Sequence, residues 1–268
     1  MEVIEKESAD ALRYWATTGR TGADSPLSPE MIANGRRLVT KLWNASRFAE
    51  GRLGDFTNET RPAELLPADR WLLSRLARTI AAATTELERY EYASSRAEVE
   101  RFFWSDLCDN YLELAKARLY GEAQQERYAA QWTLYQALLS VLKMLAPHLP
   151  YITEEIYQVL FRQWDGATSI HLAKWPLEHS EWIDREAEDI GEKILELLRQ
   201  VRRYKAERGL SVGAELKDMH VRGGLSPAQR AAFEMAMVDL KSATRAGRIV
   251  LAEADDPALH GDELAVEV

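Results

Sequence analysis

Apolar side chains recur at the three- and four-residue spacing of an α-helix over long segments of this 268-residue chain. These segments cover residues 28–50, 69–87, 96–120 and 124–146. Long helices joined by short connections pack side by side in alternating directions. The pattern therefore predicts a mainly α fold whose centre is an antiparallel helical bundle.

Capping residues predict where these helices begin and end. Ser28 offers a side-chain acceptor to the first free N–H groups, and Pro29 suits the first helical position. Asp69 is expected to cap the second helix, and Ser95, followed three residues later by a glutamate, predicts a capping box for the third. The fourth must end near Pro147, because proline lacks the N–H that a helix needs.

The chain changes its period after the bundle. A short helix over 151–162 and an extended edge strand over 168–173 are expected, and then a helix over 187–207 that Gly209 ends. Two strands flanking one helix are predicted for the remainder: a strand over 215–221, a helix over 226–244 and a strand over 248–252. The C-terminal part therefore reads as a small α+β unit.

Composition excludes several classes of protein. There is no run of the ~18 apolar residues that a membrane span needs, and the charged N-terminus is not a secretory signal. The single cysteine, Cys108, can form neither an internal disulfide nor a thiolate zinc site, so a cytoplasmic location is expected. The net charge of −9 argues against a broad nucleic-acid-coating surface but permits a local cationic site.

No catalytic constellation is visible in the chain. It lacks a Gly-rich phosphate loop and a nucleophile elbow, and its five histidines are scattered without metal-ligand spacing. Asp106, Asp109 and Glu113 do gather carboxylates on neighbouring helix positions. Two interpretations remain open for them, a metal or acid–base site and, favoured, pairing with basic side chains of an adjacent helix. We therefore predict no catalytic residue and no metal ligand.

The helix over 28–50 carries a cationic stripe opposite its apolar one. At ~100° per residue, Arg37, Lys41, Asn44 and Phe48 lie along one face. Such a face can simply keep a helix soluble. Its adjacent arginines, amide and terminal aromatic ring are also what an RNA loop can pair with and stack on. The candidate RNA-binding residues are Arg36, Arg37, Lys41, Asn44, Arg47 and Phe48.

Aromatic residues within these helices have two interpretations. Phe48 is either a stacking platform for a base or a core residue at the end of its helix. We expect Trp43, Trp104 and His148 to pack inside the bundle.

A second cationic group lies at the end of the helix over 187–207. It consists of Arg202, Arg203, Lys205 and Arg208. These side chains either contact an RNA backbone or complement the helix dipole. Arg202 and Arg203 are added to the candidate RNA-binding set.

Several segments, in order, resemble the valyl-tRNA synthetase family. The matching segments are 9–16 (ADALRYWA), 41–48 (KLWNASRF), 104–106 (WSD), 111–116 (YLELAK), 145–157 (LAPHLPYITEEIY) and 169–172 (SIHL) with Trp175-Pro176. Each match alone is weak and several are shared with the isoleucyl and leucyl relatives, but together they cover about residues 3–176. The Ala-Leu-Arg-Tyr-Trp start and the asparagine-aromatic helix favour the valyl family.

The resemblance implies a C-terminal, anticodon-binding portion of a class I enzyme. Residues 1–27 would be the connector after the catalytic core, 28–182 the helical-bundle anticodon-binding domain, and 183–268 a C-terminal helix with a small strand-helix-strand domain. The nucleotide-binding core, its two signature motifs and the editing domain are missing. This chain alone is therefore expected to be no enzyme, and ATP and Mg would serve only the missing core.

The implied function is to bind and orient the anticodon stem-loop of valine tRNA. Phe48 would stack on a base, Asn44 would read a base edge, and the basic residues of the helix would hold phosphates. The expected partners are valine tRNA and the catalytic core of the same polypeptide, with no membrane and a monomeric state. The alternative is a free-standing RNA-binding or protein-interaction module derived from a synthetase.

Overall fold

The predicted cap at Ser28 starts the longest helix, α3 (Pro29–Leu53). The Ser28 hydroxyl accepts a hydrogen bond from the Met31 N–H at 3.3 Å, and Pro29 occupies the first turn. The apolar stripe of α3 is buried, with Leu38 and Leu42 fully enclosed. The N-terminal boundary and the orientation of this helix are confirmed.

The structure is a computed structural model. It describes residues 2–19, 22, 24, 26–58, 60–223, 225–251 and 264–267. The predicted turn at 21–26 lies partly outside the described residues. The end of the predicted last strand, at residue 252, lies outside them. The chain forms two units: unit 1 comprises 1–61, 75–108 and 131–183, and unit 2 comprises 62–74, 109–130 and 184–268.

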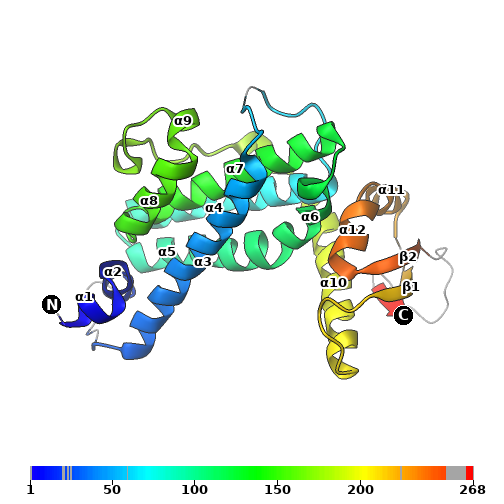
Figure 1. Cartoon of the computed structure of the whole chain (residues 1–268), viewed down its shortest axis with the longest axis horizontal. Coiled ribbons are helices and arrows are strands. Elements are labelled where there is room, and N and C mark those ends of the chain that lie inside the picture. The colour runs from blue at the N-terminus through cyan, green and yellow to red at the C-terminus, as the bar shows by residue number, and fades with distance from the viewer. Residues whose placement is uncertain are drawn as a thin grey trace. The chain divides into compact units, whose positions relative to one another are not determined.

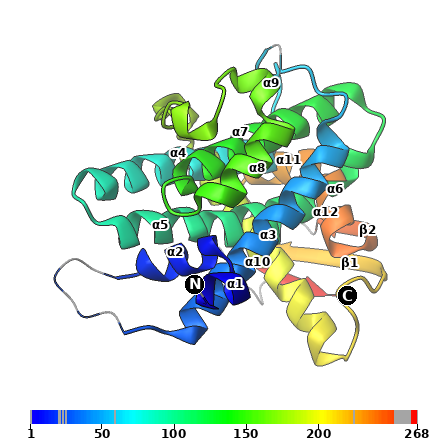
Figure 2. The ribbon, with the colours of Figure 1, turned by 60° about the vertical axis from the view of Figure 1, so that its left-hand side comes forward.

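Unit 1 is helical, and α3 crosses its long helices (Figures 1 and 2). The elements that lie wholly or largely in it are α1 (Glu2–Glu7), α2 (Ala9–Ala16), α3, α4 (Pro67–Glu88), α5 (Tyr92–Arg101), the π-helix η1 (Phe102–Tyr111), α7 (Gln124–Leu145), α8 (Pro150–Leu160), α9 (Arg162–Asp165) and the 3₁₀ turns η2 (Ile170–Leu172) and η3 (Ser180–Trp182). Fully buried rings, among them Phe103 and Tyr157, fill its core with leucines of α3, α4 and α7. The predicted bundle is confirmed.

The short N-terminal helix α2 is fixed to the rest of unit 1 by a buried aspartate and a close approach. The Asp10 carboxylate accepts the backbone N–H groups of Tyr151 and Ile152, at 3.3 and 2.7 Å, in the first turn of α8. Tyr14 packs so tightly on α3 that a Cβ at Gly35 would lie 2.8 Å from the Tyr14 Cβ. A glycine at position 35 therefore lets α2 and α3 touch.

Three sequence predictions about element boundaries are wrong. Ser95 does not cap a helix, because α5 already begins at Tyr92 and the Ser95 hydroxyl donates to the Ala83 carbonyl at 2.8 Å. Asp69 lies inside α4, where its carboxylate reaches back to the Leu66 N–H. Residues 168–173 form no strand: the Glu154 carboxylate accepts the Ile170 N–H at 2.9 Å and the chain turns into η2.

Unit 2 contains the predicted strand-helix-strand arrangement. Its elements are α6 (Leu112–Tyr120), α10 (Arg185–Glu207), β1 (Leu216–Gly223), α11 (Pro227–Met235), α12 (Met237–Thr244), β2 (Ala246–Leu251) and β3 (Leu264–Glu267). β1 is the central strand, parallel to β2 and antiparallel to β3 (Figure 1). The predicted helix is two short helices, starting at Ser226 with a capping box, and β3 was not predicted.

A buried charge network holds three segments of unit 2 together. The Arg118 guanidinium on α6 donates to both oxygens of Asp69 and of Asp239, at 2.8 to 3.0 Å, and all three side chains are fully buried. The Tyr111 hydroxyl donates to Asp69 at 2.8 Å. Because an unpaired buried charge is costly, this network favours one arrangement of α6, α12 and the start of α4, residues 67–74, which belongs to unit 2.

A close contact in unit 2 yields a stability prediction. Gly191 of α10 faces the Trp71 indole, and a Cβ there would come within 2.1 Å of a ring carbon. Trp71 is buried and cannot swing away, so Gly191→Ala is expected to lower the free energy of unfolding by about 1–3 kcal/mol. Urea unfolding would measure the loss. Ala206→Gly, at an exposed position of the same helix, should cost no more than about 1 kcal/mol and serves as control. A Gly191→Ala protein as stable as the native one would contradict this contact.

Candidate nucleic-acid interface

The outer face of α3 carries most of the candidate residues from the sequence. Arg36, Arg37, Asn44 and Arg47 are exposed. Lys41 and Phe48 are half-buried on the flank of the same face. The helix therefore brings all six candidates of this segment onto one side, as their spacing predicted, while its apolar stripe faces the bundle.

Three arginines of this face are exposed and make only local polar contacts. Arg36 pairs with Glu7 at 3.1 Å and Arg47 with Glu50 at 3.9 Å, and both arginine side chains are more than half exposed. Arg37 hydrogen-bonds Asn34 one turn earlier. Ion pairs of this kind contribute at most about 1 kcal/mol, so an incoming phosphate could replace the carboxylate at low cost.

Aromatic rings flank the cations of α3. Trp43 is 38% exposed, which corrects the expectation that it packs inside the bundle. Trp104 of η1 is half-buried, and the Lys41 ammonium lies 5.0 Å from its ring centroid. His148 is buried, as predicted. The sequence pattern therefore missed two residues of this face, Trp43 and Trp104.

The second cationic group lies on α10, in unit 2. Arg202 donates to the Asp109 carbonyl at 2.8 Å, and Arg203 pairs with Glu207 at 2.8 Å. Lys205 is buried, and its ammonium donates to the carbonyls of Val212 and Thr244. Lys205 is therefore a structural residue of the turn after α10 and inaccessible to RNA.

Two of the three carboxylates on η1 and α6, those of Asp106 and Glu113, pair with basic side chains. Arg75 of α4 donates to Asp106 at 3.2 Å, and Glu113 pairs with Lys116 on its own helix at 3.5 Å. Burial raises the pKa of Asp106, which the Arg75 charge opposes. Within the described ranges no group of three or more His, Cys, Asp or Glu side chains could hold a metal ion. Nor is any described helix both long and apolar enough to span a membrane.

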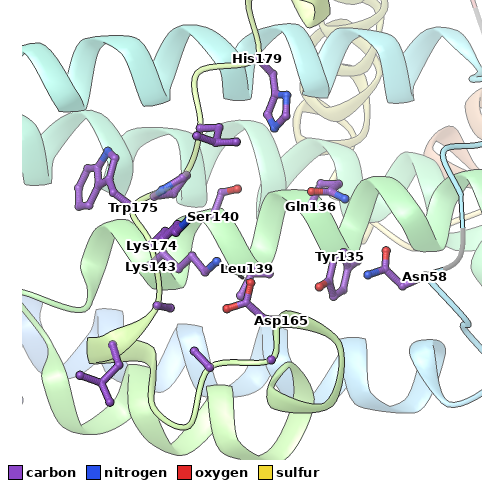
Figure 3. Close-up of a pocket in the computed structure, with 16 residues that line it drawn as sticks. Asn58, Tyr135, Gln136, Leu139, Ser140, Lys143, Asp165, Lys174, Trp175 and His179 are labelled. Atoms are coloured by element: carbon purple, nitrogen blue, oxygen red, sulfur yellow. Dashed lines mark hydrogen bonds and ion pairs between the residues drawn. The ribbon is translucent and has the colours of Figure 1, made fainter.

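A polar cavity lies beside α7 in unit 1, under the segment that follows α9 (Figure 3). Its volume is about 570 Å³. Gln136 and Ser140, one turn apart on α7, line it with Trp175 and Lys174 of the covering segment. No motif in the sequence indicates this cavity, because it depends on how an irregular segment crosses a helix.

Comparison with known proteins decides the family. The family model of the anticodon-binding domain of tRNA ligase matches residues 69–220, more than half of the chain. The chain belongs to this family. Arg202 and Arg203 lie inside the matched range, whereas α3 lies before it.

Relatives of this anticodon-binding domain extend over α3 as well. A valine–tRNA ligase from Methanopyrus kandleri is 38% identical over 99% of this chain, and one from Thermococcus kodakarensis is 44% identical over 82%. One from Rickettsia rickettsii is 36% identical over 95%. The chain covers 29%, 25% and 32% of these relatives, between a quarter and a third of their lengths.

A solved structure shows the same fold. It is the LeuRS of Agrobacterium radiobacter K84 in a ternary complex with tRNA and LeuAMS, with a TM-score of 0.51 and 18% identity. The match covers 68% of this chain and 22% of the LeuRS chain. The anticodon-binding family and the helical class I fold implied by the sequence are both confirmed.

Proposed function

We propose that this chain binds the anticodon stem-loop of a valine tRNA, as the tRNA-binding part of a longer valine–tRNA ligase. The observation that carries the proposal is the exposed cationic and aromatic face of α3 on a chain of the anticodon-binding family. The similarity of the whole chain to valine–tRNA ligases supports the choice of valine. The catalytic core that uses ATP and Mg would lie elsewhere in the polypeptide.

The division of labour on α3 follows from the chemistry of its side chains. Unpaired loop bases can be splayed out, stacked on an aromatic ring and read at their edges. The half-buried Phe48 ring would stack, the exposed Trp43 ring offers a second surface, and the Asn44 amide offers both a donor and an acceptor to a base edge. Arginine and lysine contacts to phosphates add affinity without sequence information. Arg36, Arg37, Lys41 and Arg47 would take this role.

The double variant Arg37→Ala/Lys41→Ala tests the proposed face. Removing one side chain that holds a phosphate should lower the slope of log affinity against log salt by about 0.7–0.9, so removing the pair should lower it by about 1.5. Binding of labelled valine tRNA at several salt concentrations measures that slope. Affinity at low salt should fall about tenfold or more.

A matched control carries the same change of charge on another surface of unit 1. Arg89→Ala/Arg101→Ala removes two exposed arginines, one just after α4 and one at the end of α5, which pair with Glu86 and Glu98. This control should bind tRNA with a nearly unchanged salt slope. Equally weakened binding in both double variants would mean that net charge, rather than the α3 face, attracts the RNA. Salt-independent binding would favour a protein-interaction module.

A further inference from the structure

We infer that the cavity beside α7 is a nucleotide pocket, taking one base with its phosphate. The inference deepens the proposed function, on which its RNA form rests. Its volume of about 570 Å³ lies in the ~300–1,000 Å³ range of small-molecule pockets. Three kinds of side chain that line the cavity, and its position next to the end of α3, support this inference.

Hydrogen-bonding groups without a protein partner lie along one wall of the pocket. Gln136 and Ser140 stand one turn apart on α7, and both are half-buried (Figure 3). Within the part of the chain that the structure describes, neither makes a side-chain hydrogen bond. An amide supplies both a donor and an acceptor, and a hydroxyl can act as either. Together they match the edge of a nucleobase.

An apolar, flat surface completes the place for a base. Trp175 lies at one end of the row formed by Gln136 and Ser140 (Figure 3). Its indole N–H donates to the Thr84 hydroxyl at 2.9 Å, which fixes the orientation of the ring. Leu139, buried on α7, also lines the pocket. Bases of any sequence stack favourably on such rings.

The charges around the pocket favour an anion. Lys143 is held by Asp165 at 2.6 Å, and Tyr157 donates to the same carboxylate at 2.9 Å. Lys174 on the covering segment is exposed and has no hydrogen bond or ion pair among the described residues. One acidic residue thus stands against two lysines, and the unpaired ammonium at the rim is available to a phosphate.

The pocket adjoins the C-terminal end of α3. The Gln131 amide donates to the Arg52 carbonyl at 2.7 Å and to Asp55 at 2.8 Å, and Tyr135 one turn later lines the pocket. Asn58, five residues beyond α3, also lines it, and its amide faces the Tyr135 ring (Figure 3). Burial raises the pKa of Tyr135, so its hydroxyl stays protonated. An RNA strand bound to α3 could therefore place one of its nucleotides in this pocket.

Titration of the ¹⁵N-labelled full chain with nucleoside 5′-monophosphates, inorganic phosphate and an anticodon stem-loop RNA tests the inference. The Trp175 indole N–H signal, assigned by its loss in Trp175→Phe, is the readout. We expect the nucleotides or the RNA to shift this signal, and phosphate alone to leave it unmoved. If only the RNA shifts the signal, the pocket binds a nucleotide within an RNA strand. If the free nucleotides also shift it, the pocket binds them from solution as well.

The double variant Gln136→Ala/Ser140→Ala should lower the affinity for the ligand that shifts the Trp175 signal at least about fivefold, because two hydrogen bonds are lost. Alanine favours helix, so α7 should persist. Gln163→Ala, an exposed glutamine of α9 outside the pocket, is the control. An equal shift with phosphate alone, no shift with any ligand, or an unweakened double variant would overturn the inference.

The two proposals fail separately. RNA that binds through α3 without moving Trp175, together with inert nucleotides, would overturn the pocket and leave the proposed function standing. Free nucleotides that move Trp175 in a chain that binds no RNA would support the pocket and refute the proposed function.

Discussion

Replacing Arg118 with methionine is expected to lower the free energy of unfolding of unit 2 by about 3–5 kcal/mol. Arg118 is the sole basic side chain bonded to Asp69 and Asp239 in the described network, and both carboxylates are fully buried. Methionine would fill much of the space but leave two carboxylates buried without a cation. The penalty arises from these uncompensated charges rather than from reduced packing.

The pH dependence of this variant gives a second signature of the same cause. Burial raises the pKa of Asp239 to about 6 even beside the guanidinium. Because its pKa is raised, Asp239 binds a proton more readily in the folded state than in the unfolded state. The stability that this proton contributes is complete below the ordinary carboxyl pKa and is lost as pH rises through 6. Without Arg118 the loss should deepen, and the variant should be closer to the native protein at pH 5 than at pH 7.

Urea unfolding at pH 5 and pH 7, with hydrogen exchange of α6 and α12 as the readout, would measure both the loss of unfolding free energy and its pH dependence. Lys116→Ala, at a half-buried position on the same helix with a 3.5 Å ion pair to Glu113, is the matched control and should cost less than about 1 kcal/mol. A loss below about 1 kcal/mol in Arg118→Met would show that the network does not hold unit 2 together.

Acidification from pH 6.5 to 4 is expected to destabilise unit 1 through His148, by up to roughly 3 kcal/mol. His148 is 3% exposed, and neither ring nitrogen has a hydrogen-bond partner in the described structure. Burial, followed by the charges of Arg96 and Arg13, lowers the pKa of this imidazole to about 4. The unfolded chain therefore takes the proton more readily, and stability is lost as pH falls through this window.

Thermal unfolding at intervals between pH 4 and 7 would test the role of His148. In His148→Leu, the plot of Tm against pH should be flatter between pH 6.5 and 4 than in the native protein. His171→Leu, at an exposed position, should leave the curve unchanged. An identical slope in His148→Leu and the native protein would assign the acid sensitivity of unit 1 to other groups, such as Glu154, whose pKa is lowered.

The sequence predicted those features that depend on periodicity and on local caps. Ser28 and Pro29 mark the start of α3 because a cap needs only the residues next to it. The burial of Leu38 and the exposure of Arg37 followed from a regular helical repeat. The fold class followed from several such segments taken together.

Errors arose where a partner distant in sequence decided the outcome. Ser95 has the composition of a cap, yet its hydroxyl bonds the Ala83 carbonyl across a helix pair. Asp69 is drawn inward by Arg118, 49 residues away. The exposure of Trp43 likewise depends on which neighbours cover α3, which no single-sequence pattern records.

The candidate site was predictable only in part, for the same reason. Clustered charges on α3 can be read from spacing, but the burial of Lys205 requires the turn after α10 to fold back over it. One wall of the pocket beside α7 is formed by residues between 165 and 179, where the predicted strand is absent. Its lining residues become visible only when the covering segment is in place.

The most direct test of the central claim compares the affinity of the native chain for valine tRNA and for the same tRNA with a swapped anticodon, at one fixed salt concentration. Tighter binding of valine tRNA, with the preference reduced in Phe48→Ala and Asn44→Ala, is the predicted result. Equal affinity for the two RNAs would contradict the claim that this domain reads the anticodon.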